Sequence, residues 1–134
     1  MDINDRVFEE HEIKGHCCSE TIMNMALEDM GRGEEERREL VKAMGAFCGG
    51  LDQGLACGAL CAAKSALFLA EEDSDKAHEE LGPALMAWFK DRFGAWNCRE
   101  LLEDDPGTNL ELCLSIMADT YIKLYDMLED AGAV

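Results

Sequence analysis

The residues best suited to chemistry in this 134-residue chain are its seven cysteines, three of which lie in one glycine-rich stretch. Residues 48–61 contain Cys48, Cys57 and Cys61 together with four glycines. Glycines let the backbone approach other backbone, or a cofactor, without an intervening Cβ. An apolar run of small residues at 59–70 then indicates a buried helix. Because helix N-terminal amides stabilise thiolates, this stretch predicts thiol chemistry at the start of a central helix.

Two further cysteines are expected at helix N-termini. The apolar spacing predicts an amphipathic helix from Ser19 to Met30, which places Cys18, with Cys17 before it, at or just inside the helix N-terminus. Asn97 is a good N-cap residue, so Cys98 is expected in the first turn of a short helix, beside Arg99. A helix N-terminus and a neighbouring cation both lower the pKa of a thiol. The sequence therefore predicts stabilised thiolates at both positions.

Cys57 and Cys61 are four residues apart in a helix expected from about Ala56 to Ala70. On one helical face their Cβ atoms would be roughly 5–6 Å apart. A disulfide needs about 3.8 Å, so the pair is poorly placed to bridge. Two alternatives stay open: the two thiolates hold one metal, or each thiol faces a different partner. A small core residue would also explain Cys61.

Apolar periodicity predicts helices in the remaining segments and no strand. Cys113 lies on the inward face of the last expected helix, whose start carries a Thr108–Glu111 capping box. Gly82 and Pro83 must kink or break the helix expected at 76–93. The further helices are expected near residues 3–14, 34–47 and 110–130.

The composition limits the classes of function. A net charge of −17 opposes binding to nucleic acid or to anionic membranes, and it favours a self-repelling soluble surface. The longest apolar stretch, residues 55–70, carries Lys64 and is too short to insert into a membrane. No signal peptide is recognisable, so we expect a cytoplasmic protein, in which permanent disulfides are rare. The odd cysteine count leaves at least one thiol unpaired within the chain.

Over nearly its whole length, the order of these cysteines and glycines resembles the redox-active C-GCAxxG-C-C family of small proteins. At the position where the family pattern has its next glycine, this chain has Ala62, so helix contact or cofactor approach is expected to differ there. The matching segments are Cys18-Ser19-Glu20, Gly49-Gly50, Cys57-Gly58-Ala59, Phe93-Gly94, Cys98-Arg99-Glu100-Leu101 and Cys113.

The resemblance implies a redox or metal site, and its residues are expected to serve as catalytic thiols, as metal ligands, or as both. Cys17, Cys48 and Cys61 are extra to the pattern. The four family cysteines are Cys18, Cys57, Cys98 and Cys113, and the glycines expected beside a cofactor are Gly49, Gly50 and Gly58.

Several forms of this chemistry stay open at this point. The thiols are a dithiol redox couple, or they hold zinc or an iron–sulfur cluster. The alternative is a non-catalytic carrier or interaction protein whose cysteines are buried or serve transient metal or sulfur transfer. The cofactor and the redox partner are unknown, and the small-residue helix permits a homodimer. No hydrolase or nucleotide-binding motif is recognisable.

The expected fold is a single all-α domain over residues 1–134. It is a bundle of about five to six helices, with the glycine-rich turn before the central helix. The cysteine-bearing helix starts are expected to gather around that central helix.

Overall fold

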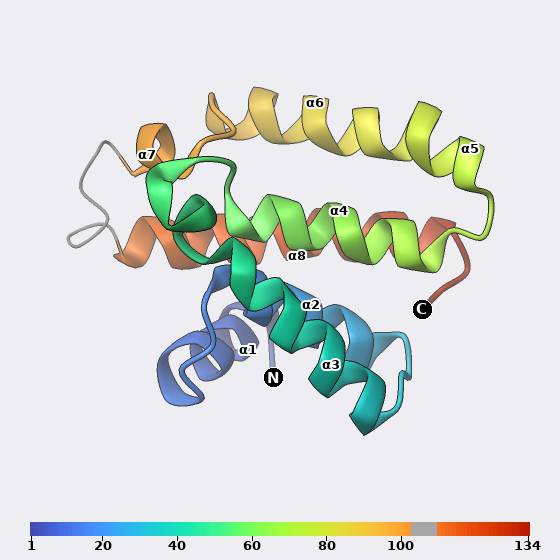
Figure 1. The fold of residues 1–134 in the computed structure, drawn as a ribbon, viewed down its shortest axis with the longest axis horizontal. Helices are drawn as coiled ribbons and strands as arrows, with labels where there is room; N and C mark the ends of the chain where they lie inside the picture. Colours follow the sequence, from blue (N-terminus) through green and yellow to red (C-terminus); the bar gives the residue numbers. More distant parts are fainter. Residues whose placement is uncertain (103–109) are drawn as a thin grey trace.

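The computed structural model describes residues 1–102 and 110–134, and within these ranges it is helical and contains no strand. The predicted all-α fold is confirmed (Figure 1). None of the described helices is both long and apolar enough to cross a membrane. The helices are α1 (Ile3–Phe8), α2 (Cys18–Asp29), α3 (Glu34–Met44), α4 (Gly58–Ala70), α5 (Ser74–Lys76), α6 (Gly82–Phe93), α7 (Cys98–Leu101) and α8 (Leu110–Asp130).

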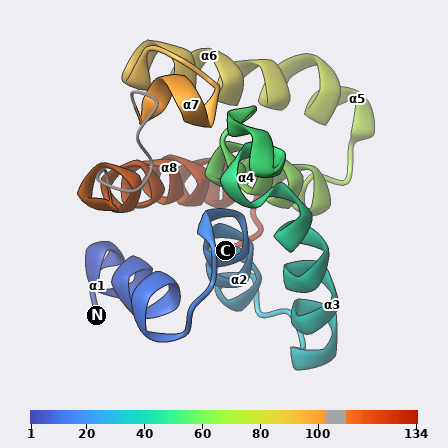
Figure 2. The same cartoon turned by 60° about the vertical axis from the view of Figure 1, so that its left-hand side comes forward.

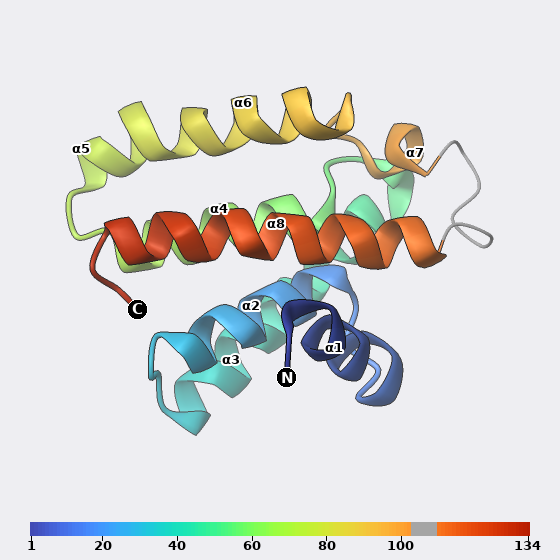
Figure 3. The ribbon, with the colours of Figure 1, turned by 180° about the vertical axis from the view of Figure 1, so that it is seen from behind.

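The helices form three layers around α4 and α8, which lie side by side in the middle (Figures 1 and 3). Helices α5 and α6 cover one side of this pair, and α1, α2 and α3 cover the other. The central position of α4 follows from its composition, because most of its alanines and leucines are buried while its small side chains let neighbouring helices approach closely. Fully buried larger side chains include Ile22, Leu60, Leu67, Phe89 and Tyr121.

Helix α8 buries most of the stripe that its periodicity predicts. Met117, Leu124 and Leu128 are completely buried, whereas Leu110, at the start of the helix, is exposed. The expected Thr108–Glu111 capping box falls partly on residues 103–109, which lie outside the described residues.

A partly buried ionic cluster fixes α1, α2 and α8 to one another. Both terminal nitrogens of Arg6 donate to the Asp29 carboxylate, at 3.0 and 3.1 Å. The hydroxyl of Tyr121, a fully buried residue, donates to the same carboxylate. Burial and the neighbouring carboxylate both raise the pKa of Tyr121, so the phenol stays protonated and remains a donor.

The helix that precedes Pro83 neither breaks nor ends. A π-helical turn at Ala77–Leu81 continues directly into α6, and Gly82 keeps right-handed helical backbone angles. Asp73 caps α5 by accepting from the Lys76 amide at 3.2 Å. Pro83 has no N–H to donate to the preceding turn, and the helix accommodates it next to the π-helical turn, where the regular hydrogen-bond pattern already changes.

The glycine-rich turn before α4 has an unusual backbone. Four consecutive residues, Gly49, Gly50, Leu51 and Asp52, have φ angles of 62°, 62°, 61° and 59°. Left-handed conformation costs an L-residue roughly 1–2 kcal/mol, so only the two glycines adopt it freely. A Cβ on Gly50 would also approach the backbone of Leu55 to 2.4 Å. The glycines are therefore required by the turn itself.

Candidate thiol site

Four cysteines from four separate elements line one small pocket at the end of the bundle. Cys18 is the first residue of α2, Cys57 precedes α4, Cys98 begins α7, and Cys113 lies in α8. The open space among them is about 20 Å³, enough for roughly one water molecule or ion. The rest of the wall is apolar and consists of Ala59, Leu101, Leu102, Ile116 and Met117.

Backbone hydrogen bonds join the segments that carry Cys57 and Cys98. The Cys57 amide donates to the Trp96 carbonyl at 2.8 Å, and the Cys98 amide donates to the Leu55 carbonyl at 2.7 Å. An isolated antiparallel bridge forms between these two bonds. Two cysteines 41 positions apart are thus held at one place by main-chain contacts, at the end of the bundle where α7 lies (Figure 2).

Gly58 lets Cys18 reach this pocket. A Cβ added to Gly58 would lie 2.7 Å from the Cys18 sulfur and 2.9 Å from the Phe47 carbonyl oxygen. The first turn of α4 therefore packs directly against the first turn of α2. Protein atoms fill the space above Gly58, and a contact between a cofactor and Gly49, Gly50 or Gly58 stays a prediction.

Burial raises the pKa of all four pocket thiols, contrary to the expectation of stabilised thiolates. The backbone amides of Ser19, Gly49 and Ala59 do favour the thiolate of Cys18, but the loss of hydration outweighs them. For Cys113 the same loss, with repulsion from the Cys18 and Cys98 thiolates, raises the pKa to about 12. The helix-terminus effect is present, and desolvation exceeds it.

The groups expected to activate Cys98 are engaged elsewhere. The Arg99 guanidinium donates to the Gln53 carbonyl at 2.9 Å. Asn97 occupies the N-cap position, but its side chain donates to Glu100 at 3.2 Å and does not cap the helix. Burial therefore dominates, and it raises the pKa of Cys98 as well.

Cys57 and Cys61 lie in different surroundings. Cys57 is the N-cap of α4 with non-helical angles, so only Cys61 lies within the helix. Cys57 lines the pocket, whereas Cys61 is absent from its wall. Of the two alternatives, the structure supports the one in which each thiol faces different surroundings.

A family model described as "Putative redox-active protein (C_GCAxxG_C_C)" matches residues 16–127. The chain belongs to the C_GCAxxG_C_C family. No curated protein and no solved structure matches it. The family description adds redox activity to the geometry, and the four cysteines that resemble the family pattern are those that line the pocket.

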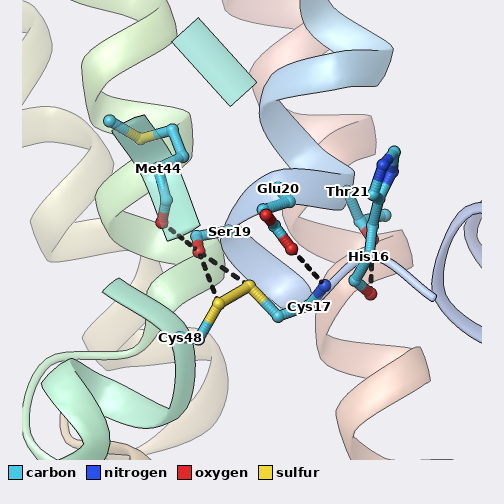
Figure 4. The surroundings of a disulfide bond; sticks show 7 residues. All are labelled: His16, Cys17, Ser19, Glu20, Thr21, Met44 and Cys48. Atoms are coloured by element: carbon cyan, nitrogen blue, oxygen red, sulfur yellow. Dashed lines mark hydrogen bonds between the residues drawn. A yellow bond between two sulfur atoms is a disulfide. The ribbon is translucent and has the colours of Figure 1, made fainter. Parts of the chain in front are cut away.

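A disulfide lies outside the four cysteines of the C_GCAxxG_C_C pattern. Cys17 and Cys48 are bonded, with their Cα atoms 5.8 Å apart (Figure 4). This pair was not expected from the sequence, because two cysteines 31 positions apart carry no pairing signal. Each bonded cysteine directly precedes a residue of the C_GCAxxG_C_C site: Cys18 follows Cys17, and Gly49 follows Cys48.

The distances between possible ligand atoms show which side chains already lie close enough together to bind one metal ion. Among the described residues, one group of three donors has its atoms within 4.8 Å of one another, and it consists of Cys17, Glu20 and Cys48. The pocket thiols of the C_GCAxxG_C_C pattern, all of them described, form no such group. Their chemistry suits a soft metal, but the four side chains must draw closer around a single ion.

His16, which directly precedes Cys17, contacts a buried carboxylate. Its Nδ1 lies 2.8 Å from a carboxylate oxygen of Glu10, and Lys14 contacts the other oxygen at 2.9 Å. These two partners, with Asn24, hold the pKa of the buried Glu10 carboxyl below its usual range in spite of its burial.

Proposed function

We propose that this chain is a redox protein in which Cys18, Cys57, Cys98 and Cys113 together hold a thiolate-bound metal centre. The redox-active form of this centre is proposed to be an iron–sulfur cluster. The observation that carries the proposal is the meeting of these four thiols in one apolar pocket. Chance burial of single cysteines would scatter them through the core instead.

The protonation of the thiols favours a metal over a free dithiol. A free thiol in this pocket is uncharged at neutral pH, because burial raises its pKa. The thiolate is the nucleophile in disulfide exchange, so these thiols are poor exchange reagents on their own. A metal cation reverses this preference, since its charge deprotonates the thiols that ligate it.

The redox activity of the family selects among metals. Zinc accepts thiolates readily but has no redox chemistry. Iron–sulfur clusters use four cysteine ligands, and their potentials depend on burial and on hydrogen bonds to sulfur. Cys18 and Cys57 supply such a setting, because backbone amides of Gly49, Ala59 and Leu60 favour their thiolates.

The space in the pocket fits a single ion more readily than a cluster. The opening of about 20 Å³ holds roughly one small species. A cluster therefore requires residues of the pocket wall, such as Leu101 and Leu102 at the end of the four-residue helix α7, to move outward. The expected working compartment is the cytoplasm, where reducing conditions keep these thiols available.

The test is metal analysis of protein that has been purified and handled anaerobically, or reconstituted with iron and sulfide. We expect iron and sulfide bound in stoichiometric amounts, charge-transfer bands in the visible spectrum, and bleaching of these bands by a reductant. A metal-free chain after reconstitution, with all four pocket thiols still titratable, refutes the proposal.

The sharpest variant pair is Cys57→Ser with Cys61→Ser as its control. Both lie at the start of α4, but only Cys57 lines the pocket. We expect C57S to lose at least about 10-fold in iron occupancy, and C61S, C17S and C48S to stay within about 2-fold of the unaltered chain. Equal loading of C57S and C61S places the centre elsewhere.

A second candidate is a carrier or interaction protein without redox turnover. The uncharged state of the buried thiols favours it, because such thiols are chemically quiet. Stoichiometric zinc, with no iron after reconstitution, supports this reading and contradicts the iron–sulfur proposal.

A further inference from the structure

The Cys17–Cys48 pair is a thiol system separate from the pocket, because neither residue contributes to the pocket wall. We propose that it is a reversible dithiol/disulfide couple that exchanges electrons with an external dithiol. This site lies outside the family pattern, and its operation does not depend on whether the pocket holds a metal.

The pair is accessible, unlike the buried Cys57. Cys17 and Cys48 are both partly exposed, and they lie where the loop before α2 meets the turn after α3. Their Cα separation of 5.8 Å falls within the usual range for disulfides, so the bond forms without moving the backbone. An external thiolate can therefore approach the bond from solvent, as disulfide exchange requires.

The side chains around the bond suit both redox states. The Ser19 Oγ donates to the Met44 carbonyl at 2.7 Å, which fixes its position (Figure 4). It lies 3.2 Å from the Cys17 sulfur and 3.9 Å from the Cys48 sulfur. After reduction, the Cys17 thiol can therefore donate its hydrogen to Ser19 without any rearrangement.

Cys17 is the better leaving group of the two. It is the N-cap of the 12-residue helix α2, where amide dipoles stabilise a departing thiolate. Glu20 accepts from the Cys17 amide at 2.9 Å, and its carboxylate lies within 4.8 Å of both sulfurs.

The exchange balances as two thiol–disulfide steps. A thiolate of the external dithiol attacks the Cys48 sulfur, which breaks the Cys17–Cys48 bond and forms a mixed disulfide with Cys48. Cys17 leaves as a thiolate and takes up a proton. The second external thiol then attacks the mixed disulfide and releases Cys48 as a thiol. The external dithiol loses two electrons and two protons, and the protein gains them.

The scaffold is held without the bond. Helix α2 packs on α3, α4 and α8, and the Ser19–Met44 hydrogen bond joins the same two segments as the disulfide. Reduction therefore leaves the fold in place, as a working couple requires. A disulfide that opens only when the chain unfolds would instead be structural.

The test equilibrates the unaltered full chain with graded ratios of reduced and oxidised dithiothreitol, under native conditions. Free thiols are trapped with N-ethylmaleimide, and peptides are identified by mass spectrometry. We expect Cys17 and Cys48 to gain label together in one reversible transition, with a linked Cys17–Cys48 peptide at the oxidised end and no change in helical circular dichroism.

The controls separate this couple from the pocket. C61S should reproduce the transition of the unaltered chain, while C17S and C48S should each abolish the linked peptide. Because labelling is resolved by peptide, failure of metal loading in the pocket leaves this measurement unaffected. Three results overturn the proposal: full labelling of Cys17 at every ratio, a pairing with another cysteine, or a bond that opens only in urea.

Discussion

The close contact between α4 and Cys18 makes Gly58→Ala a direct test of how the pocket is built. The new Cβ would lie 2.7 Å from the Cys18 sulfur and 2.9 Å from the Phe47 carbonyl oxygen. To reach an ordinary separation of 3.4 Å, the sulfur must move by about 0.7 Å. The Phe47 carbonyl belongs to the main chain of the turn after α3 and cannot rotate away, so that turn must move away from α4 as well.

Two opposing terms set the size of the effect. Overpacking typically costs about 1–3 kcal/mol. Alanine improves helix propensity by up to about 1 kcal/mol. We expect G58A to lower the free energy of unfolding by about 1–2 kcal/mol and to reduce metal occupancy, because Cys18 is displaced from the pocket.

The assay combines urea unfolding of the reduced protein with iron analysis after reconstitution. Gly33→Ala is the control, because Gly33 has a negative φ and no atom lies within 4 Å of the position that its new methyl group would take. We expect G33A to cost less than about 1 kcal/mol, as for an N-cap change, and to load iron normally. A G58A protein that is as stable as the unaltered chain and loads iron fully refutes the packing argument.

Three further predictions concern stability. The first concerns the metal-free reduced protein, in which a thiol whose pKa is raised by folding contributes to the stability of the fold. This contribution is fully present below the unfolded-state pKa of about 8.5 and is lost as the pH rises above it. The pKa of Cys113 is raised to about 12, so the free energy of unfolding should fall above about pH 8.5, by at most about 1.4 kcal/mol per pH unit for this thiol. In urea unfolding at a series of pH values, Cys113→Ala should therefore show a weaker fall of the unfolding free energy with pH. An unchanged pH dependence contradicts the assigned burial of Cys113. Tyr121→Phe removes the hydroxyl that donates to Asp29 and should lower the free energy of unfolding in urea by about 1.5 kcal/mol. Tyr125→Phe, at an exposed position, should change this free energy little. Equal effects of the two variants would show that the hydrogen bond to Asp29 contributes nothing to stability. The Cys17–Cys48 bond closes a loop with a separation of 31 residues, so the oxidised chain should be more stable than the reduced chain by roughly 3–4 kcal/mol. The C17S/C48S double variant should show no difference in stability between oxidising and reducing conditions. A double variant that keeps this difference would assign the difference to another cysteine pair.

The sequence was sufficient to predict the helices, because apolar spacing follows local rules, whereas the role of the site residues stays a prediction. Apolar spacing located α2 and α8, and the start of α4 was expected within two residues of its position. Resemblance to the family selected Cys18, Cys57, Cys98 and Cys113, which line one pocket.

The pKa directions, the disulfide and the contact of Arg99 were not predicted correctly, because they depend on distances in the packed fold. The pKa directions were wrong because a helix terminus is visible in sequence, whereas the burial that outweighs it is a property of the packed fold. The Cys17–Cys48 bond was missed because it joins the loop before α2 to the turn after α3, two segments that are far apart in the sequence. Arg99 was assigned to its sequence neighbour Cys98, but its long side chain reaches the Gln53 carbonyl.

The four pocket thiols also impose an order on the biogenesis of the protein. Cys18 and Cys57 can meet as soon as α2 and α4 pair, but Cys113 belongs to α8, which is synthesised after the segments that carry the other three thiols. The ligand set of the proposed metal centre is therefore complete only after α8 has left the ribosome. For that proposed centre, we expect metal loading to follow the emergence and docking of α8.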